Sequence, residues 1–316
     1  MCKYDMKLNF FLFLISGIIF SIGSLISSQD TINTSEDVSD LRKKMIVYEL
    51  QDYKYKFFKG DTIRYRVASF DSIIINYDKP LEKTRFELVE ITCDSTTKDN
   101  RFLLKIKLKQ YIADESYGKV QNIRRTTTPW LDRWTMIWID SLGNRLQTIA
   151  DDNNLLAMSP GGAFAPHLFF PFRERYRYIN ELWLENSHDT LCENGIPCSI
   201  VKQFSQFRGA EPIDTLGYEC VRFNYIKTAN GLVDVITEDS FLRTDATIAG
   251  SGVMTISKND GIPIHYFANV EQKLAIFNNS DESIPGLHLI STDWTIDSFI
   301  PSPKRIEFDK KQNQKK

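Results

Sequence analysis

Side chains that commonly carry acid–base or metal chemistry are few and scattered in this chain. Its 316 residues include four histidines, His167, His188, His265 and His288. No two of them stand four residues apart, the spacing that places two metal ligands on one helix face. We therefore predict no metal site, no catalytic histidine and no cofactor.

Other catalytic patterns are equally weak. The acid pairs Asp151-Asp152 and Asp281-Glu282 flank turn-like residues, so we interpret them as solvated loops rather than as the two carboxyls of a glycosidase. The run 249–252 (AGSG) lacks the spacing of a nucleophile elbow, and 159–162 (SPGG) lacks the lysine of a phosphate loop. We expect a protein that is not an enzyme, with a hydrolase as the least favoured alternative.

Aromatic residues offer a stronger signal. Trp130, Trp134 and Trp138 fall four residues apart, so on a strand they share one face. Several phenylalanines cluster beside Pro166 and Pro171. These aromatics are either core or the wall of an apolar pocket or sheet face offered to a partner. The candidate ligand-binding residues are Trp130, Trp134, Trp138, Phe164, Phe169 and Phe170.

The first residues have the order of a secretory signal peptide. Lys3 and Lys7 precede an apolar run over 8–20, and small polar residues follow to Ser28. We predict cleavage after Ser28 and export to the periplasm or beyond. The alternative is an uncleaved anchor, because 8–26 approaches the roughly 20 residues that span a bilayer. Membrane contact is expected only through this segment.

Export bears on the cysteines, because an oxidising compartment permits pairing. Cys192 and Cys198 bracket the turn-like sequence ENGIP, and we predict a disulfide between them, with free thiols as the alternative. Cys220 lies in a strand-like run and is predicted to be a small buried residue.

Overall composition is that of a globular protein and argues against one that binds nucleic acid. The chain has 42% hydrophobic and 25% charged residues, which is typical of a globular fold. Its 39 basic and 41 acidic residues nearly cancel, so no global basic field exists to bind nucleic acid.

The elements that position these residues are predicted to be strands. Ile63, Tyr65 and Val67 alternate with arginines, and the run 104–108 alternates with lysines. This period of two favours curved antiparallel sheets with one buried face and few short helices. The fold class is therefore mainly β.

We predict five segments. Residues 1–28 are the signal peptide, and 29–52 are a polar leader with a short helix. Residues 53–158 and 159–300 repeat a strand, strand and hairpin order, which suggests two similar β units side by side in a sandwich or half-barrel. Residues 301–316 read as a solvated, basic polar tail.

A family resemblance follows from three features. These are 59–62 (KGDT) entering a strand, the twofold strand pattern, and the hairpin from Gly252 to Ile264 with its Gly261-Ile262-Pro263 end. The chain resembles exported β-rich proteins of Bacteroidetes-type bacteria and, more distantly, the periplasmic lipoprotein-carrier superfamily. The resemblance implies a curved antiparallel sheet and makes lipid or lipoprotein handling an expectation; it transfers no binding residue.

Two functional hypotheses follow. The first is an exported, non-enzymatic binding module of the cell envelope, with an apolar sheet face for a ligand or an envelope protein. The second is a structural or assembly component of the envelope without a small-molecule ligand.

Overall fold

A computed structural model describes residues 50–151, 168–172, 174–178, 181–191, 199–236, 241–278 and 282–314. They belong to one unit, Tyr48–Lys316. The predicted signal peptide and most of the predicted leader lie outside the described residues. No helix in the described ranges is long and apolar enough to cross a bilayer.

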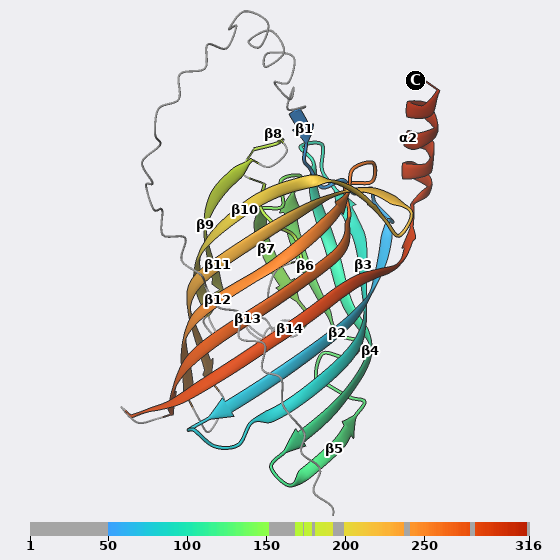
Figure 1. Ribbon diagram of the computed structural model, residues 1–316. Helices are drawn as coiled ribbons and strands as arrows, with labels where there is room; N and C mark the ends of the chain where they lie inside the picture. The colour runs from blue at the N-terminus through green and yellow to red at the C-terminus, as the bar shows by residue number, and fades with distance from the viewer. Residues whose placement is uncertain are drawn as a thin grey trace, which may run out of the picture. The chain divides into compact units, whose positions relative to one another are not determined.

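The fold is mainly β, as predicted (Figure 1). The strands are β1 (Leu50–Asp52), β2 (Thr62–Ile75), β3 (Leu81–Thr96), β4 (Arg101–Tyr117), β5 (Val120–Arg125), β6 (Trp134–Asp140), β7 (Arg145–Ala150), β8 (Tyr176–Tyr178), β9 (Leu182–Leu191), β10 (Ser199–Thr215), β11 (Tyr218–Ile236), β12 (Phe241–Ser257), β13 (Pro263–Asn278) and β14 (Ser283–Ile300). A helix, α2 (Pro303–Asn313), follows the last strand.

One antiparallel sheet contains 12 of these strands. Its order is β7-β6-β4-β3-β2-β14-β13-β12-β11-β10-β9, with β5 paired to β4. The strands of the two predicted units meet edge to edge, because β2 pairs with β14 from Thr62↔Ile300 to Ile75↔Gly286. Both sets of strands therefore belong to one continuous sheet, and β1 pairs separately with β8.

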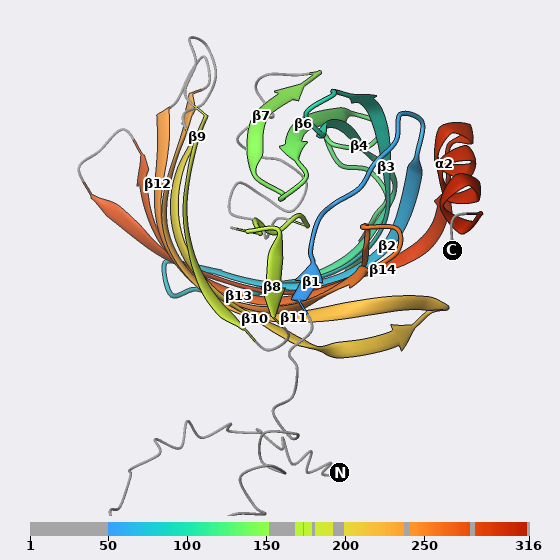
Figure 2. The same cartoon turned by 90° about the horizontal axis from the view of Figure 1, so that it is seen from above.

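The sheet curves and is open, with β7 and β9 at the ends of its strand path (Figure 2). Register shifts such as that between Leu88 and Val89 add residues to one strand, which bends and twists the sheet locally. We call the concave side the inner face; β1 and β8 lie on this side (Figure 2).

Alternation along the strands matches the sequence prediction. In β2, Ile63, Tyr65 and Val67 are buried while Arg66 is exposed. In β4, Leu104 and Leu108 are buried. The buried set points to the inner face, because alternate residues of a strand point to opposite sides.

Two segments outside the sheet complete the core. In residues 53–57, Tyr53, Tyr55 and Phe57 are buried at every second position, and residues 168–172 pack beside them. The hydroxyl of Tyr55 accepts a hydrogen bond of 2.8 Å from the backbone N–H of Phe170, which joins the two segments. We call residues 53–57 and 168–172 the cover.

The C-terminal residues differ from the predicted solvated tail. They form α2, whose cap residue Ser302 accepts a hydrogen bond of 3.3 Å from the Arg305 N–H. Pro303 at the first helical position suits a helix start, and Lys310 and Lys311 suit its end. Arg305 is buried, so this segment belongs to the folded unit.

Candidate ligand-binding site

The three predicted tryptophans lie at the β6 end of the sheet. Trp130 is partly buried and packs against the core. In β6, Ile137 and Ile139 are buried while Trp134 and Trp138 are only half-buried. Trp134 and Trp138 therefore share the face of β6 that points away from the inner side.

The predicted phenylalanines lie elsewhere. Phe169 and Phe170 are buried in the cover, with ring centroids 5.3 Å from Tyr55 and 4.7 Å from Tyr225 respectively. Trp134 and Trp138 do not join them on the inner face. Phe164 lies outside the described residues.

The predicted disulfide also lies outside the described residues, because both Cys192 and Cys198 do. It stays a prediction. Cys93 and Cys220 are free and buried, and burial raises the pKa of the Cys220 thiol to about 11.

An aromatic wall forms part of the inner face beneath the cover. Tyr225 and Tyr266 stack with centroids 6.3 Å apart, and their hydroxyls are 2.9 Å apart. A side chain on Gly252 would clash with the Tyr225 ring, since its Cβ would stand 2.6 Å from Cε1. Glycine at this position therefore allows Tyr225 to lie flat across β12. The wall consists of Phe207, Phe223, Tyr225 and Tyr266, all buried.

Charged residues occupy another part of the inner face, on β2, β3 and β14. Arg85 donates to Asp71 at 2.7 Å and to Glu87 at 3.2 Å, and His288 Nε2 lies 3.0 Å from Asp71 Oδ1. We call Asp71, Arg85, Glu87 and His288 the polar cluster. Each member has a charged or hydrogen-bonding partner, so the cluster is internally matched.

Electrostatics within the polar cluster follow from its contacts. Burial alone raises the pKa of Asp71, but the hydrogen bond from His288 and the charge of Arg85 outweigh it, so that pKa lies below its usual value. For Glu87, burial dominates over Arg85 and raises the pKa. His288 and Arg85 together therefore favour the charged form of Asp71.

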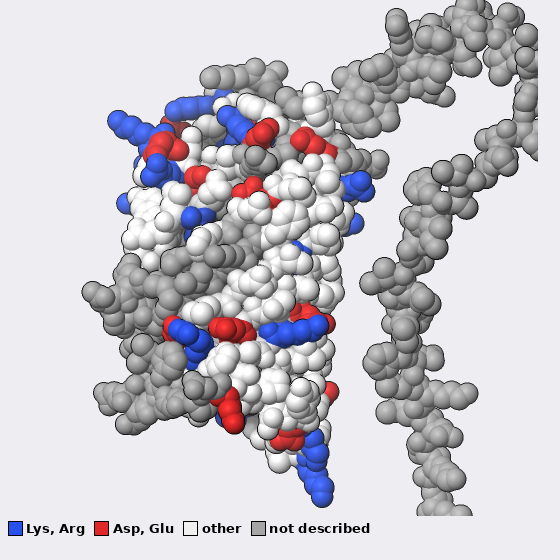
Figure 3. All heavy atoms as spheres, turned by 90° about the vertical axis from the view of Figure 1, so that its left-hand side faces the viewer, with Lys and Arg blue, Asp and Glu red and all other residues white. Residues whose placement is uncertain are grey.

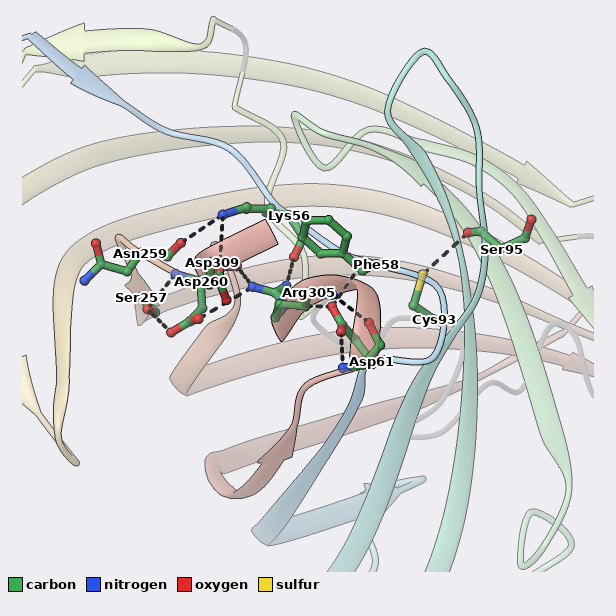
Figure 4. Close-up of polar contacts among 11 residues, drawn as sticks. Lys56, Phe58, Asp61, Cys93, Ser95, Ser257, Asn259, Asp260, Arg305 and Asp309 are labelled. Atoms are coloured by element: carbon green, nitrogen blue, oxygen red, sulfur yellow. Dashed lines mark hydrogen bonds and ion pairs between the residues drawn. The ribbon is translucent and has the colours of Figure 1, made fainter. Parts of the chain in front are cut away.

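A second matched pair anchors α2 (Figure 4). Asp61 is 0% exposed and Arg305 is 1% exposed, and Arg305 Nε donates to Asp61 at 2.9 Å. Asp61 also accepts from the backbone N–H groups of Phe58 and Ser302. Arg305 further donates to the carbonyls of Lys56 and Asp260. The pair therefore ties together segments that lie far apart in the sequence.

Lys227, on β11, has no such match. It is 7% exposed, and no ion pair or hydrogen bond joins its ammonium group to another described residue. Burial lowers the pKa of Lys227 to about 8. A buried lysine without a partner is costly, and such groups are often found at functional sites.

The two residues that pair with Lys227 across the sheet are polar or small. In the register, Lys227 pairs with Ser205 on β10 and with Gly250 on β12. A Cβ on Gly250 would stand 3.4 Å from Lys227 Cε, so glycine leaves the space into which the lysine extends. Gln272, two strands away on β13, is buried on the inner face one inward position beyond Val270, the residue that pairs with Gly250.

Lys227 also borders the aromatic wall. Tyr225 is two residues away on the same strand and therefore on the same face. The inner face thus places one unmatched cation beside an apolar aromatic surface. We take Lys227, with Ser205, Tyr225, Gly250 and Gln272, as the candidate site.

Sequence reasoning missed this site, although a signal was present. Val221, Phe223 and Tyr225 stand at every second position of a predicted strand, and Lys227 is the next residue in this series. A lysine at this position is predicted to point inward. Nothing in the pattern of β11 indicates whether neighbouring strands supply Lys227 with a partner.

On the outer face, charged side chains are interspersed. Basic and acidic residues are mixed over the side shown in Figure 3, with broad areas between them that carry neither. One group of apolar side chains is contiguous across three strands. Phe86, 53% exposed, pairs in register with Ala68 on β2 and with Ile112 on β4. Phe70 is the next residue on the same face of β2 after Ala68. We call Ala68, Phe70, Phe86 and Ile112 the outer patch.

In the described ranges, no three His, Cys, Asp or Glu residues are grouped so that they could hold a metal ion.

Comparisons with known proteins give little. No family model and no curated protein matches the chain. Among solved structures, it is similar to Pseudomonas aeruginosa OccK2 (OpdF), with 8% identity, coverage of 77% of this chain and 100% of that chain, and a TM-score of 0.25.

Proposed function

We propose that this chain is an exported, non-enzymatic binding module of the cell envelope. Its ligand has an apolar part, which lies on the aromatic wall of the inner face after displacing part of the cover. The observation that carries the proposal is the way the cover is held. The cover packs its aromatic rings against the wall, yet it is not a strand of the main sheet.

Backbone attachment of the cover consists of separate hydrogen bonds rather than a ladder. In residues 53–57, three backbone N–H groups donate to carbonyl oxygens. Tyr53 donates to Arg175 at 2.8 Å, Tyr55 to Ser141 at 2.8 Å, and Lys56 to Gly261 at 3.1 Å. The Lys56 carbonyl also accepts from Arg305. In residues 168–172, the Phe172 N–H donates to the Leu142 carbonyl at 2.6 Å. A paired strand of the sheet instead has a continuous ladder, such as that between β11 and β12. The cover therefore opens at a lower cost in backbone hydrogen bonds than a sheet strand does.

Tyr53 adds a second reason. Its hydroxyl is buried and finds no hydrogen-bond partner among the residues that the structure describes. Burial, with a smaller contribution from the charge of Glu181, raises the pKa of Tyr53 to about 12, so the hydroxyl is protonated and uncharged at neutral pH. An unsatisfied buried hydroxyl costs on the order of 1–3 kcal/mol, which destabilises the closed cover.

Two ring-preserving variants test the proposal. Tyr53→Phe removes the unsatisfied hydroxyl, so it should stabilise the cover and weaken uptake of a fluorescent acyl ester with an uncharged head. Tyr55→Phe removes the acceptor for Phe170, so it should loosen the cover and strengthen uptake. Equal responses of the two variants, or no uptake by the wild type, would contradict the proposal.

The structural or assembly role is the second candidate, and the outer patch favours it. A contiguous apolar patch on the outer face suits contact with an envelope protein. If this role is the true one, Phe86→Ser should remove a co-purified partner, detected by native mass spectrometry of envelope-purified protein, and the wild type should take up no acyl ester. Retention of the partner in the variant counts against it.

A further inference from the structure

We infer that Lys227 is a head-group anchor, which binds the carboxylate of a fatty-acid-like ligand whose chain lies on the aromatic wall. This inference rests on the proposed function and deepens it by naming the class of ligand. The juxtaposition that carries it is an unmatched buried cation beside an apolar surface.

Charge matching separates Lys227 from the other buried charges of the described core. Arg85 has Asp71 and Glu87, and Arg305 has Asp61. Along the inner face, the acid nearest to Lys227 in register is Glu185, two strands away on β9, and no ion pair joins them. One anionic group supplied by a ligand would complete the match.

Hydrogen-bonding groups around Lys227 suit a carboxylate. Ser205 and Gln272 are both buried on the inner face, and a hydroxyl and an amide can each donate to a carboxylate oxygen. No hydrogen bond joins the Gln272 side chain to another described residue. Two polar side chains of this face, Lys227 and Gln272, are therefore available to a ligand.

Glycine makes room for the lysine side chain at the site. Gly250 lies directly across from Lys227, and a Cβ there would stand 3.1 Å from the Asn269 carbonyl oxygen and 3.4 Å from the lysine chain. The adjacent inward position, Gly252, accommodates Tyr225. Gly250 and Gly252 thus place the lysine next to the edge of the aromatic wall. A ligand with a charged head group and an apolar chain needs these two surfaces side by side.

The test compares three twelve-carbon ligands at neutral pH: dodecanoate, dodecanol and dodecyltrimethylammonium. Binding is measured by displacement of the fluorescent acyl ester. Wild type should bind dodecanoate at least tenfold more tightly than dodecanol, and the cation least tightly. Lys227→Met should lose the preference for dodecanoate while its affinity for dodecanol stays the same.

Lys83→Met is the matched control, because Lys83 lies on the inner face but is paired with Glu115 at 3.0 Å. It should keep the preference for dodecanoate. Lys227→Gln offers the same comparison if the methionine variant does not fold. Equal wild-type affinity for dodecanoate and dodecanol overturns the anchor and leaves the proposed function standing. Failure of every ligand to bind overturns both.

Discussion

Two regions of the inner face differ in whether their buried charges are paired. On β2, β3 and β14, Asp71, Arg85, Glu87 and His288 form a matched cluster. On β11, Lys227 is also buried, but no described residue forms an ion pair or hydrogen bond with its ammonium group. Both regions belong to the same sheet, so differences in fold do not explain the contrast.

This difference distinguishes charges that stabilise the fold from the charge that we propose binds a ligand. Removing one partner of a matched buried pair leaves the other uncompensated, which is strongly destabilising. Removing an unmatched buried charge instead relieves its desolvation. The sign of the stability change on mutation therefore distinguishes the two regions.

The largest effect is expected at the α2 anchor. Arg305→Met leaves Asp61 buried without its cation, so the free energy of unfolding should fall by about 3–5 kcal/mol. Urea denaturation measures it. Lys311→Met, which breaks the exposed Lys311–Glu307 pair on the same helix, is the control and should leave stability unchanged. A similar response of the two variants would refute a structural role for the anchor.

The opposite sign is expected at Lys227. Without ligand at pH 7, Lys227→Met should raise the free energy of unfolding by about 3 kcal/mol, because burial lowers the pKa of Lys227 from its ordinary value of 10.5 to about 8. The lysine's penalty is fully present below pH 8, shrinks as pH rises toward 10.5, and vanishes above it.

Denaturation curves of wild type and Lys227→Met between pH 6 and 11 would measure this dependence. Their separation should narrow as pH rises. A variant that is less stable than wild type at pH 7 would show that Lys227 is a stabilising residue, and the contrast between the two regions would fail.

A smaller loss is expected in the polar cluster. Asp71→Asn weakens the match for Arg85 while Glu87 remains, so stability at neutral pH should fall by about 1–3 kcal/mol. Because the pKa of Asp71 is lowered, its contribution is present above the unfolded pKa and is lost as pH falls through the folded one. Acid titration of stability should therefore be shallower in the variant.

The smallest effect is expected for Trp134→Ala. Trp134 is half-buried on the face of β6 that points away from the inner side, so stability should fall by only about 1 kcal/mol and acyl ester uptake should not change. Loss of uptake without loss of stability would move the binding surface from β11–β13 to β6.

Local features of this fold were predictable from the sequence. Alternation at Ile63, Tyr65 and Val67 predicted the strand and its buried face. The α2 start was also within reach, because Ser302 and Pro303 form a recognisable cap, but the basic composition of 301–316 favoured a solvated tail. Short-range patterns encode strands and caps directly.

Long-range pairing was not predictable. Asp61 and Arg305 are 244 residues apart, and nothing near either residue indicates the other. The same holds for the edge-to-edge pairing of β2 with β14, which makes one sheet from both predicted units. Whether Lys227 is matched depends on neighbouring strands, so its inward direction was predictable from β11 but its lack of a partner was not.

Proton uptake on binding tests the central claim most directly. At pH 9 Lys227 is mostly neutral in the free protein, given its pKa of about 8, while burial raises the pKa of neighbouring Tyr225 far above this range. Dodecanoate binding should restore the lysine's charge. Calorimetry in two buffers of different ionisation enthalpy should therefore show uptake of roughly one proton per ligand at pH 9 and almost none at pH 6, with none in Lys227→Met. Binding at pH 9 without proton uptake, or with equal uptake in the variant, would contradict the assignment of Lys227 as the anchor.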